Sequence, residues 1–182
     1  MIRNVVFNLQ DTYITGLESF LLSADFHIPK DYIDWLYRKE ITEKSFWEHV
    51  IGFYDIDYVN SLKRQVRGSF TEIEGSAEYV MKLRRKGYNV GLISDHCEEW
   101  IDYISENFDL ERLFPKRCYS FEIGRLKSDP MAWSPAFEKL CMQPDETHLI
   151  DKSETNLRAA IEGPAQVRSG HVYKGTPEVV HI

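Results

Sequence analysis

Three short apolar segments of the chain each end in polar side chains that could take part in chemistry. The apolar runs at 5–7, 88–93 and 147–150 are typical of strands buried in a parallel sheet. In such a sheet, sites form at the carboxyl ends of the strands. We therefore expect one common site, made from the polar residues that follow these runs. They are Asn8, Gln10, Asp11, Ser94, Asp95, Asp151 and Lys152.

The segments between these strands show helical spacing, so strand and helix alternate along the chain. Repeated strand–helix–strand units imply right-handed crossovers and a parallel sheet. The fold class that follows is α/β, a Rossmann-like parallel sheet core with an inserted all-helical cap. Helices are expected over 76–86, 98–108 and 153–162, and a short strand over 118–121. Another helix should open at Pro130 and restart with Ser134 as its cap, because Pro135 is awkward in a helix interior.

Residues 14–71 follow a helical pattern with polar breaks, and four short helices fit that stretch. We expect these helices to form a cap, inserted into an α/β core of residues 1–13 and 72–182. Eleven of the 24 aromatic residues fall in this segment. A small helical unit needs large side chains to build a core, and this is the interpretation we favour. The alternative is a contact surface for a protein partner or a second copy of the chain.

Composition and charge restrict the class of protein. The chain has 182 residues, 43% of them apolar, which is enough to bury a core. With 29 acidic and 22 basic residues the formal charge is −7. Because we also identify no basic cluster, we expect no binding to nucleic acid or to an anionic membrane. We find neither a membrane-spanning run nor a signal peptide. The three cysteines lack metal-ligand spacing and are interpreted as free thiols, which favours a cytoplasmic protein.

Four segments, taken in order, resemble the motifs of the haloacid dehalogenase-like (HAD) hydrolases, which are mostly phosphatases. Residues 5–12 resemble the first motif, an apolar strand followed by Asp-x-Asp-x-Thr. Residues 92–94 look like the second motif, and residues 124–130 look like the third, with its Lys before an Asp-Pro helix start. Residues 149–156 are similar to the fourth. The insert resembles the family's first cap class, in the subgroup with sugar-phosphate phosphatases and the N-terminal domain of soluble epoxide hydrolase.

The resemblance implies roles for five positions. In the family, the first Asp of the first motif attacks phosphorus and the Asp two residues later serves as acid and base. These positions are Asn8 and Gln10 here. The Ser and Lys of the second and third motifs bind phosphoryl oxygens, which assigns Ser94 and Lys127 to a phosphate or another small anion. The fourth-motif acids hold Mg²⁺ with the first Asp, and Asp151 is the matching metal position.

Both carboxylates on which the family's chemistry depends are missing. A carboxamide has no anionic oxygen to attack with and no proton to relay near neutral pH, so Asn8 and Gln10 are degenerate positions. The backbone carbonyl of Gln10 could still bind a metal. Lys152 replaces the next fourth-motif acid, and its ammonium would repel a dication about 4 Å away by about 8 kcal/mol at an effective dielectric constant near 20. Asp95 adds negative charge beside Ser94, where the subgroup often has Asn.

Several of these positions leave alternatives open. We expect Lys152 to stand in for Mg²⁺, with its ammonium among Asp151, the Asn8 side-chain oxygen and backbone carbonyls. In the alternative, Lys152 extends into solvent and leaves a weakened metal site. Lys127 either binds an anion or pairs with Asp151. Asp11 is disfavoured as a displaced nucleophile, because adjacent residues of an extended chain point to opposite sides.

Three histidines complete the set of candidate groups. His96, His148 and His171 have no second ligand at metal spacing on one helix, and we expect surface or capping roles for them. Ser94 and His96 are too close in sequence to form a hydrolytic pair without a third, orienting group.

Two functions from different classes fit these observations. The first is a HAD-like pseudoenzyme without a cofactor, which acts by binding a ligand or a protein partner. The second is a Mg²⁺-dependent phosphatase or hydrolase of small phosphorylated metabolites, with residual or altered chemistry. We favour the first, because the substitutions affect the nucleophile, the acid/base and the metal position together.

Overall fold

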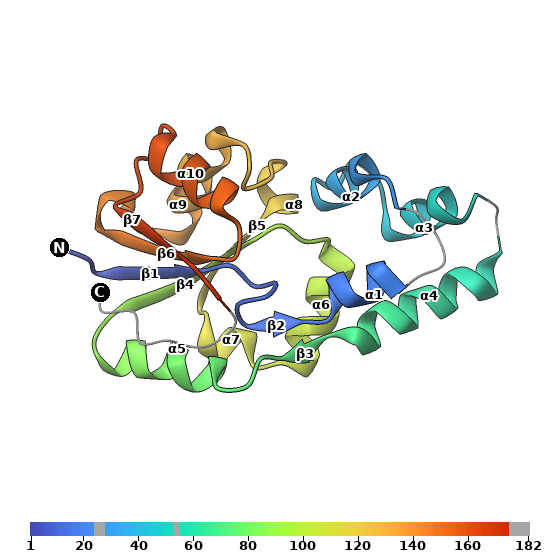
Figure 1. Cartoon of the computed structure of the whole chain (residues 1–182), viewed down its shortest axis with the longest axis horizontal. Helices are drawn as coiled ribbons and strands as arrows, with labels where there is room; N and C mark the ends of the chain where they lie inside the picture. Colours follow the sequence, from blue (N-terminus) through green and yellow to red (C-terminus); the bar gives the residue numbers. More distant parts are fainter. Residues whose placement is uncertain (24–27, 53–54, 175–182) are drawn as a thin grey trace.

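The computed structural model describes residues 1–23, 28–52 and 55–174 and contains a five-stranded parallel sheet (Figure 1). The spatial order is β5-β4-β1-β6-β7, and all neighbouring pairs are parallel, so the strands end at one common edge. This arrangement confirms the predicted α/β class with a Rossmann-like core. The strands are β1 (Asn4–Phe7), β4 (Asn89–Ser94), β5 (Lys116–Tyr119), β6 (Thr147–Asp151) and β7 (Ser169–Val172).

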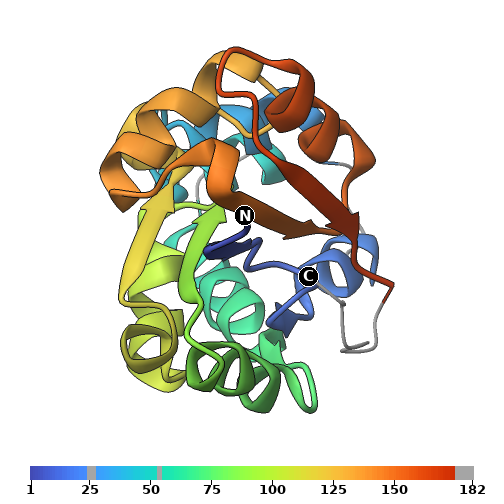
Figure 2. The same ribbon diagram turned by 90° about the vertical axis from the view of Figure 1, so that its left-hand side faces the viewer.

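Helices cover both faces of the sheet, as the view in Figure 2 shows. Side chains alternate along β1, so Val5 and Phe7 pack against one layer of helices and Val6 packs against the other. The first layer contains α5 (Ser76–Arg85), α6 (Glu98–Asn107) and α7 (Leu110–Leu113). The second contains α9 (Trp133–Leu140) and α10 (Glu154–Glu162). By the same alternation, Asn8 and Asp151 face the second layer.

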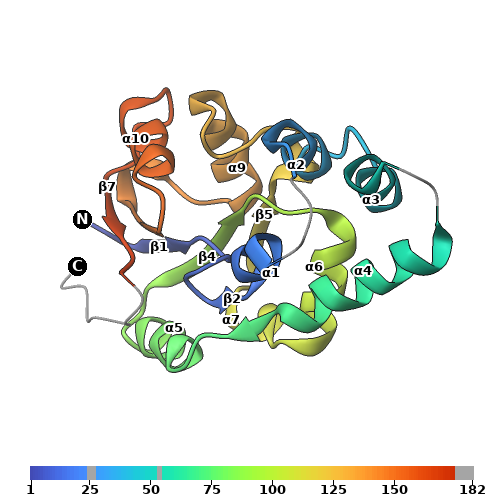
Figure 3. The same cartoon turned by 45° about the vertical axis from the view of Figure 1, so that its right-hand side comes forward.

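Four further helices extend past the carboxyl ends of the strands (Figures 1 and 3). Side-chain caps explain where two of these helices, α3 and α4, begin. The Thr42 side chain accepts a hydrogen bond from the backbone N–H of Ser45, and the Asp55 side chain accepts one from the backbone N–H of Tyr58. No strand occurs in the described part of residues 20–65. The division into a core and a cap as separate domains stays a prediction. The helices are α1 (Leu17–Ser23), α2 (Lys30–Tyr37), α3 (Glu43–Ile51) and α4 (Ile56–Ser69).

A short antiparallel pair, β2 (Ile14–Thr15) with β3 (Thr71–Glu72), joins the two ends of this helical segment. The sequence did not predict it, since two-residue strands have no recognisable period. Gly16 follows β2 with φ 115°, and a Cβ there would lie 1.8 Å from the carbonyl oxygen of Ser69. A glycine is therefore required where the entering and leaving chains approach each other.

Most predicted elements lie close to their expected bounds. The helices expected over 76–86, 98–108 and 153–162 are α5, α6 and α10. The strand expected over 118–121 begins two residues earlier, and α8 (Ser120–Ile123) follows it directly. The capping role of Ser134 was wrong. The 3-10 turn η1 (Pro130–Ala132) runs into α9, and Pro135 lies in the first turn of α9. Proline is tolerated there because residues of the first turn have no acceptor within their own helix, so the missing N–H costs no hydrogen bond. A second 3-10 turn is η2 (Pro144–Glu146).

The aromatic residues of the helical segment are divided between interior and surface. Phe46 and Trp47 are fully buried, which fits the interpretation as core, whereas Trp35 and Tyr58 are exposed. Phe53 and Tyr54 lie outside the described residues. None of the helices in the described ranges has the length and apolar content needed to cross a membrane.

Candidate functional site

A cavity of about 410 Å³ opens at the carboxyl edge of the sheet, and we call it the mouth. The ends of β1 and β6 and the loop after β4 supply most of its polar side chains, as predicted. Tyr37, the last residue of α2, reaches it from the helical segment. The lining residues are Asn8, Gln10, Asp11, Tyr37, Asp95, Lys127, Asp151, Lys152, Ser153 and Asn156. Ser94 is fully buried and contacts the site through Asn8.

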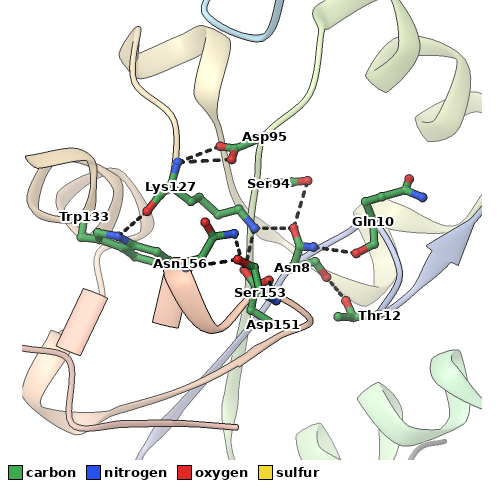
Figure 4. Close-up of polar contacts among 10 residues, drawn as sticks. All are labelled: Asn8, Gln10, Thr12, Ser94, Asp95, Lys127, Trp133, Asp151, Ser153 and Asn156. Carbon is green, nitrogen blue, oxygen red and sulfur yellow. Dashed lines mark hydrogen bonds and ion pairs between the residues drawn. The ribbon is translucent and has the colours of Figure 1, made fainter. Parts of the chain in front are cut away.

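The neighbours of Asn8 hold its amide in one orientation (Figure 4). Its Nδ2 donates to the backbone carbonyl of Gln10 at 2.6 Å. Its Oδ1 accepts from Nζ of Lys127 at 2.6 Å and from Oγ of Ser94 at 3.4 Å. If the amide were flipped, its oxygen would face the Gln10 carbonyl, and its NH₂ group would face the ammonium of Lys127. A carboxylate here would also place an oxygen against the Gln10 carbonyl, unless a cation lay between the two oxygens.

Lys127 and Asp151 form a buried ion pair beside Asn8. Nζ of Lys127 lies 2.7 Å from Oδ2 of Asp151, and each side chain is 5% exposed. The same Oδ2 accepts from Nδ2 of Asn156 at 3.2 Å, and Oδ1 accepts from the backbone of Ser153 at 2.8 Å. Both carboxylate oxygens are therefore hydrogen-bonded by the chain itself. Of the two alternatives for Lys127, the structure shows the pairing with Asp151; binding of an anion by Ser94 and Lys127 stays a prediction.

The loop that carries Lys127 is fixed by its backbone. Its N–H donates to Oδ1 of Asp95 at 3.0 Å, and its carbonyl accepts from Nε1 of Trp133 at 2.9 Å. Burial raises the pKa of Asp95, and the charge of Lys127 opposes that rise. Asp95 thus connects the end of β4 to the lysine loop and keeps a carboxylate at the mouth.

Lys152 lines the mouth, but its ammonium does not lie between Asn8 and Asp151, so that prediction was wrong. Its Nζ lies 3.2 Å from Oδ2 of Asp11, and its side chain is 53% exposed. The physical reason is strand alternation: Asp151 points into the mouth, so the next side chain turns the other way. The ammonium in the expected place belongs to Lys127.

The carboxylate of Asp11 lies at the rim of the mouth and accepts hydrogen bonds from three side chains. Besides Lys152, it accepts from Nε2 of Gln10 at 3.1 Å and from Oγ1 of Thr15 at 3.1 Å. These contacts give no support to Asp11 as a displaced nucleophile. The other end of the Gln10 amide, Oε1, is buried and has no hydrogen-bond donor among the described residues.

The side chains of the mouth do not fit a magnesium site. Mg²⁺ requires near-octahedral oxygen ligands. The oxygens of Asp151 already accept hydrogen bonds, and the Gln10 carbonyl accepts from Asn8. Across the described ranges, no three His, Cys, Asp or Glu side chains are grouped so that they could hold a metal ion. Lys127 supplies the positive charge that pairs with the buried Asp151 carboxylate.

The predicted surface or capping roles were wrong for two histidines. His96 is fully buried, with its ring stacked on Tyr37 at 5.8 Å and edge-on to Trp100 at 5.7 Å. Burial lowers the pKa of His96 to about 3, and both ring nitrogens lack a hydrogen-bond partner in the part of the chain described. Burial also lowers the pKa of His148 to about 4, and its Nδ1 lies 2.8 Å from Oγ of Ser169. Both rings are therefore neutral structural groups.

Sequence reasoning assigned no site role to three residues that line the mouth, Tyr37, Ser153 and Asn156. Tyr37 lies far from the motifs, and no local signal connects it with the mouth. Asn156 had a signal, because it stands where the fourth motif has an Asn, yet it was assigned no role. In the structure it holds one oxygen of Asp151.

The sequence pattern of the family described as haloacid dehalogenase-like hydrolase matches residues 30–168. The chain belongs to this family. The matched range begins in α2 and includes the positions of Ser94, Lys127 and Asp151. No curated protein sequence matches this HAD-like chain.

Solved structures of HAD proteins share the fold. A HAD family enzyme from Bacteroides thetaiotaomicron, in complex with magnesium and inorganic phosphate, is 20% identical with a TM-score of 0.78; the match covers 100% of this chain and 98% of that one. L-2-haloacid dehalogenase from Xanthobacter autotrophicus, with chloropropionic acid covalently bound, is 14% identical with a TM-score of 0.65. That match covers 93% of this chain and 76% of the dehalogenase.

Proposed function

We propose that this HAD-like protein has lost metal-dependent phosphoryl transfer and acts by binding a small ligand at the mouth or a protein partner. The observation that carries the proposal is the network of Asn8, Lys127 and Asp151, in which ammonium and amide groups satisfy the oxygens that a metal would need. The protein therefore has a preformed cavity without the charge arrangement for catalysis.

Nucleophilic attack also lacks a suitable group. Asn8 offers an amide oxygen that already accepts from Lys127, and an amide is a poor nucleophile. Gln10 cannot exchange a proton near neutral pH, and its Nε2 donates to Asp11. These two positions support the absence of turnover independently of the metal.

The proposal leaves two kinds of binding partner. A phosphate or another small anion at Lys127 would have to compete with Asp151 at 2.7 Å, and Asp95 places a further carboxylate at the same cavity. A protein partner or a second copy could instead use the exposed rings of Trp35 and Tyr58 on the helical segment. We also propose that the protein is located in the cytoplasm.

A Mg²⁺-dependent hydrolase of small phosphorylated metabolites is the second candidate, and one observation favours it. A variant of the Bacteroides enzyme with one aspartate replaced by alanine was also crystallised with magnesium and inorganic phosphate. Loss of one aspartate is thus compatible with metal and phosphate binding in that protein. Here, however, the sequence also has Lys152 where the fourth motif has its next acid.

Hydrolysis of p-nitrophenyl phosphate in MgCl₂ separates the two candidates. We expect the wild-type protein to release no more product than Asp151→Asn, because neither has an intact nucleophile or metal site. Asp145→Asn, an exposed change in η2, serves as the matched control. Turnover that survives in the control and disappears in Asp151→Asn would establish the hydrolase instead.

A further inference from the structure

A second cavity is lined by residues of α5 and its start and by Arg112 of α7. These two helices lie below the sheet in Figure 1. The volume of the cavity is about 740 Å³, and we call it the α5–α7 groove. Ala77 and Met81 contribute apolar surface, and both pack against the main hydrophobic core. The lining residues are Gly75, Ala77, Glu78, Tyr79, Met81, Lys82, Arg85 and Arg112.

The α5–α7 groove is positively charged in a protein that is acidic overall. Lys82, Arg85 and Arg112 line it, against the carboxylate of Glu78. Neither Lys82 nor Arg85 takes part in an ion pair among the described residues. Residues 82–86 contain four cations in five positions, so the expectation of no basic cluster was wrong for this run.

The end of a helix accounts for only part of this charge. Cations in the last turn of α5 interact favourably with the helix dipole. Arg112, however, comes from α7 and is held in place. Its Nε pairs with Asp109, its backbone carbonyl accepts from Arg84, and its Nη1 lies 4.0 Å from Sδ of Met81. Two helices therefore bring cations to one groove, where Arg112 is already paired with Asp109, whereas Lys82 and Arg85 have no ion pair among the described residues.

We propose that the α5–α7 groove binds an acidic peptide segment of a partner protein, with carboxylates on Lys82 and Arg85 and an apolar side chain on Met81. The patch covers about two helical turns, or about 11 Å, which is too short to contact the six to ten phosphates typical of a nucleic-acid site. A membrane surface is disfavoured because the rest of the chain is acidic. A concave site with an apolar floor suits a peptide.

Fluorescence anisotropy with the full chain tests this proposal. The probe is a fluorescein-labelled peptide of alternating glutamate and leucine, and the corresponding lysine–leucine peptide is the charge-reversed control. We expect saturable binding of the acidic peptide that weakens with NaCl. Lys82→Glu and Arg85→Glu should each weaken binding by roughly tenfold or more, because each replaces an attractive charge with a repulsive one.

Arg64→Glu is the matched control, because it makes the same charge change at an exposed position of α4. It should alter the affinity by less than about twofold if binding is local. An equal loss in Arg64→Glu would show a net-charge effect and overturn the proposal, as would the absence of saturable binding. Tighter binding to phosphatidylserine vesicles, lost in Arg85→Glu, would identify a membrane site instead. The milder variant Arg85→Gln should also weaken binding, and a circular dichroism spectrum like that of the wild type would show that it is folded.

Discussion

Two buried charge clusters of this protein can be compared directly. One is the mouth network of Asn8, Lys127 and Asp151 at the strand ends. The other lies between the helical segment and the core and is centred on Glu43 of α3. Glu43 is 1% exposed and accepts from Arg67 of α4 at 2.8 Å and from Nε1 of Trp100 of α6 at 2.8 Å. The Glu43 cluster joins three helices and has an architectural role.

The comparison shows how closely the mouth has come to resemble a structural cluster. In both, a buried carboxylate is neutralised by a cation of the chain and hydrogen-bonded by further donors. The mouth differs in two ways: it borders a cavity, and Oε1 of Gln10 lacks a donor there among the described residues. The proposed function treats the mouth as a cavity whose charges are satisfied within the chain.

Lys127→Met should cause the largest loss of stability. It leaves the Asp151 carboxylate buried without a cation, at a cost of about 3–5 kcal/mol. The midpoint of urea unfolding measures this effect. Lys127→Met with Asp151→Asn should recover much of the loss, since no unpaired charge remains. If Lys127→Met alone were more stable than the wild type, the ion pair would be destabilising, as expected of a site kept for ligand binding at the expense of stability.

Glu43→Gln should destabilise the protein by about 2–3 kcal/mol, less than Lys127→Met. The amide still accepts from the indole of Trp100, and Arg67 is 24% exposed and can reach water. Glu111→Gln is the matched control, because Glu111 is 80% exposed in its pair with Arg117. We expect the control to change the unfolding free energy by less than about 1 kcal/mol. Equal losses of stability in the two variants would show that the buried Glu43 contributes no more than a surface carboxylate, and would contradict its structural role.

Acid should destabilise the protein through His96. Its pKa falls from 6.5 to about 3 on folding, so below pH 6.5 the unfolded chain binds a proton that the folded chain does not. The sign is a loss of stability as pH falls, on the order of 2 kcal/mol between pH 7 and pH 5 from this residue. Urea unfolding at both pH values measures it. His96→Phe should flatten the slope, whereas the exposed His49→Phe should not.

The sequence predicted the sheet and the location of the site better than the contacts within the site. Apolar runs and helical periods are local signals, and they identified β1, β4, β6, α5, α6 and α10. The strand ends then had to meet at one edge, which brought Asn8 and Asp151 together. Which lysine pairs with Asp151 depends on side-chain direction and on the path of a long loop, so Lys152 was assigned the place of Lys127. The burial of His96 depends on α2 and α6 packing together, which no local pattern contains.

The central claim is that Asn8 and Lys127 satisfy the mouth without Mg²⁺. Calorimetric titration with MgCl₂ tests it most directly, on the wild type and on the double variant Asn8→Asp with Lys152→Asp. The double variant places one new carboxylate inside the mouth, at position 8, and removes the ammonium beside Asp11 at its rim. The Asn8→Asp change sets an oxygen against the Gln10 carbonyl, which lies 2.6 Å from the present amide nitrogen. We predict no micromolar binding to the wild type and measurable binding to the double variant. Micromolar Mg²⁺ affinity in the wild type would contradict the account.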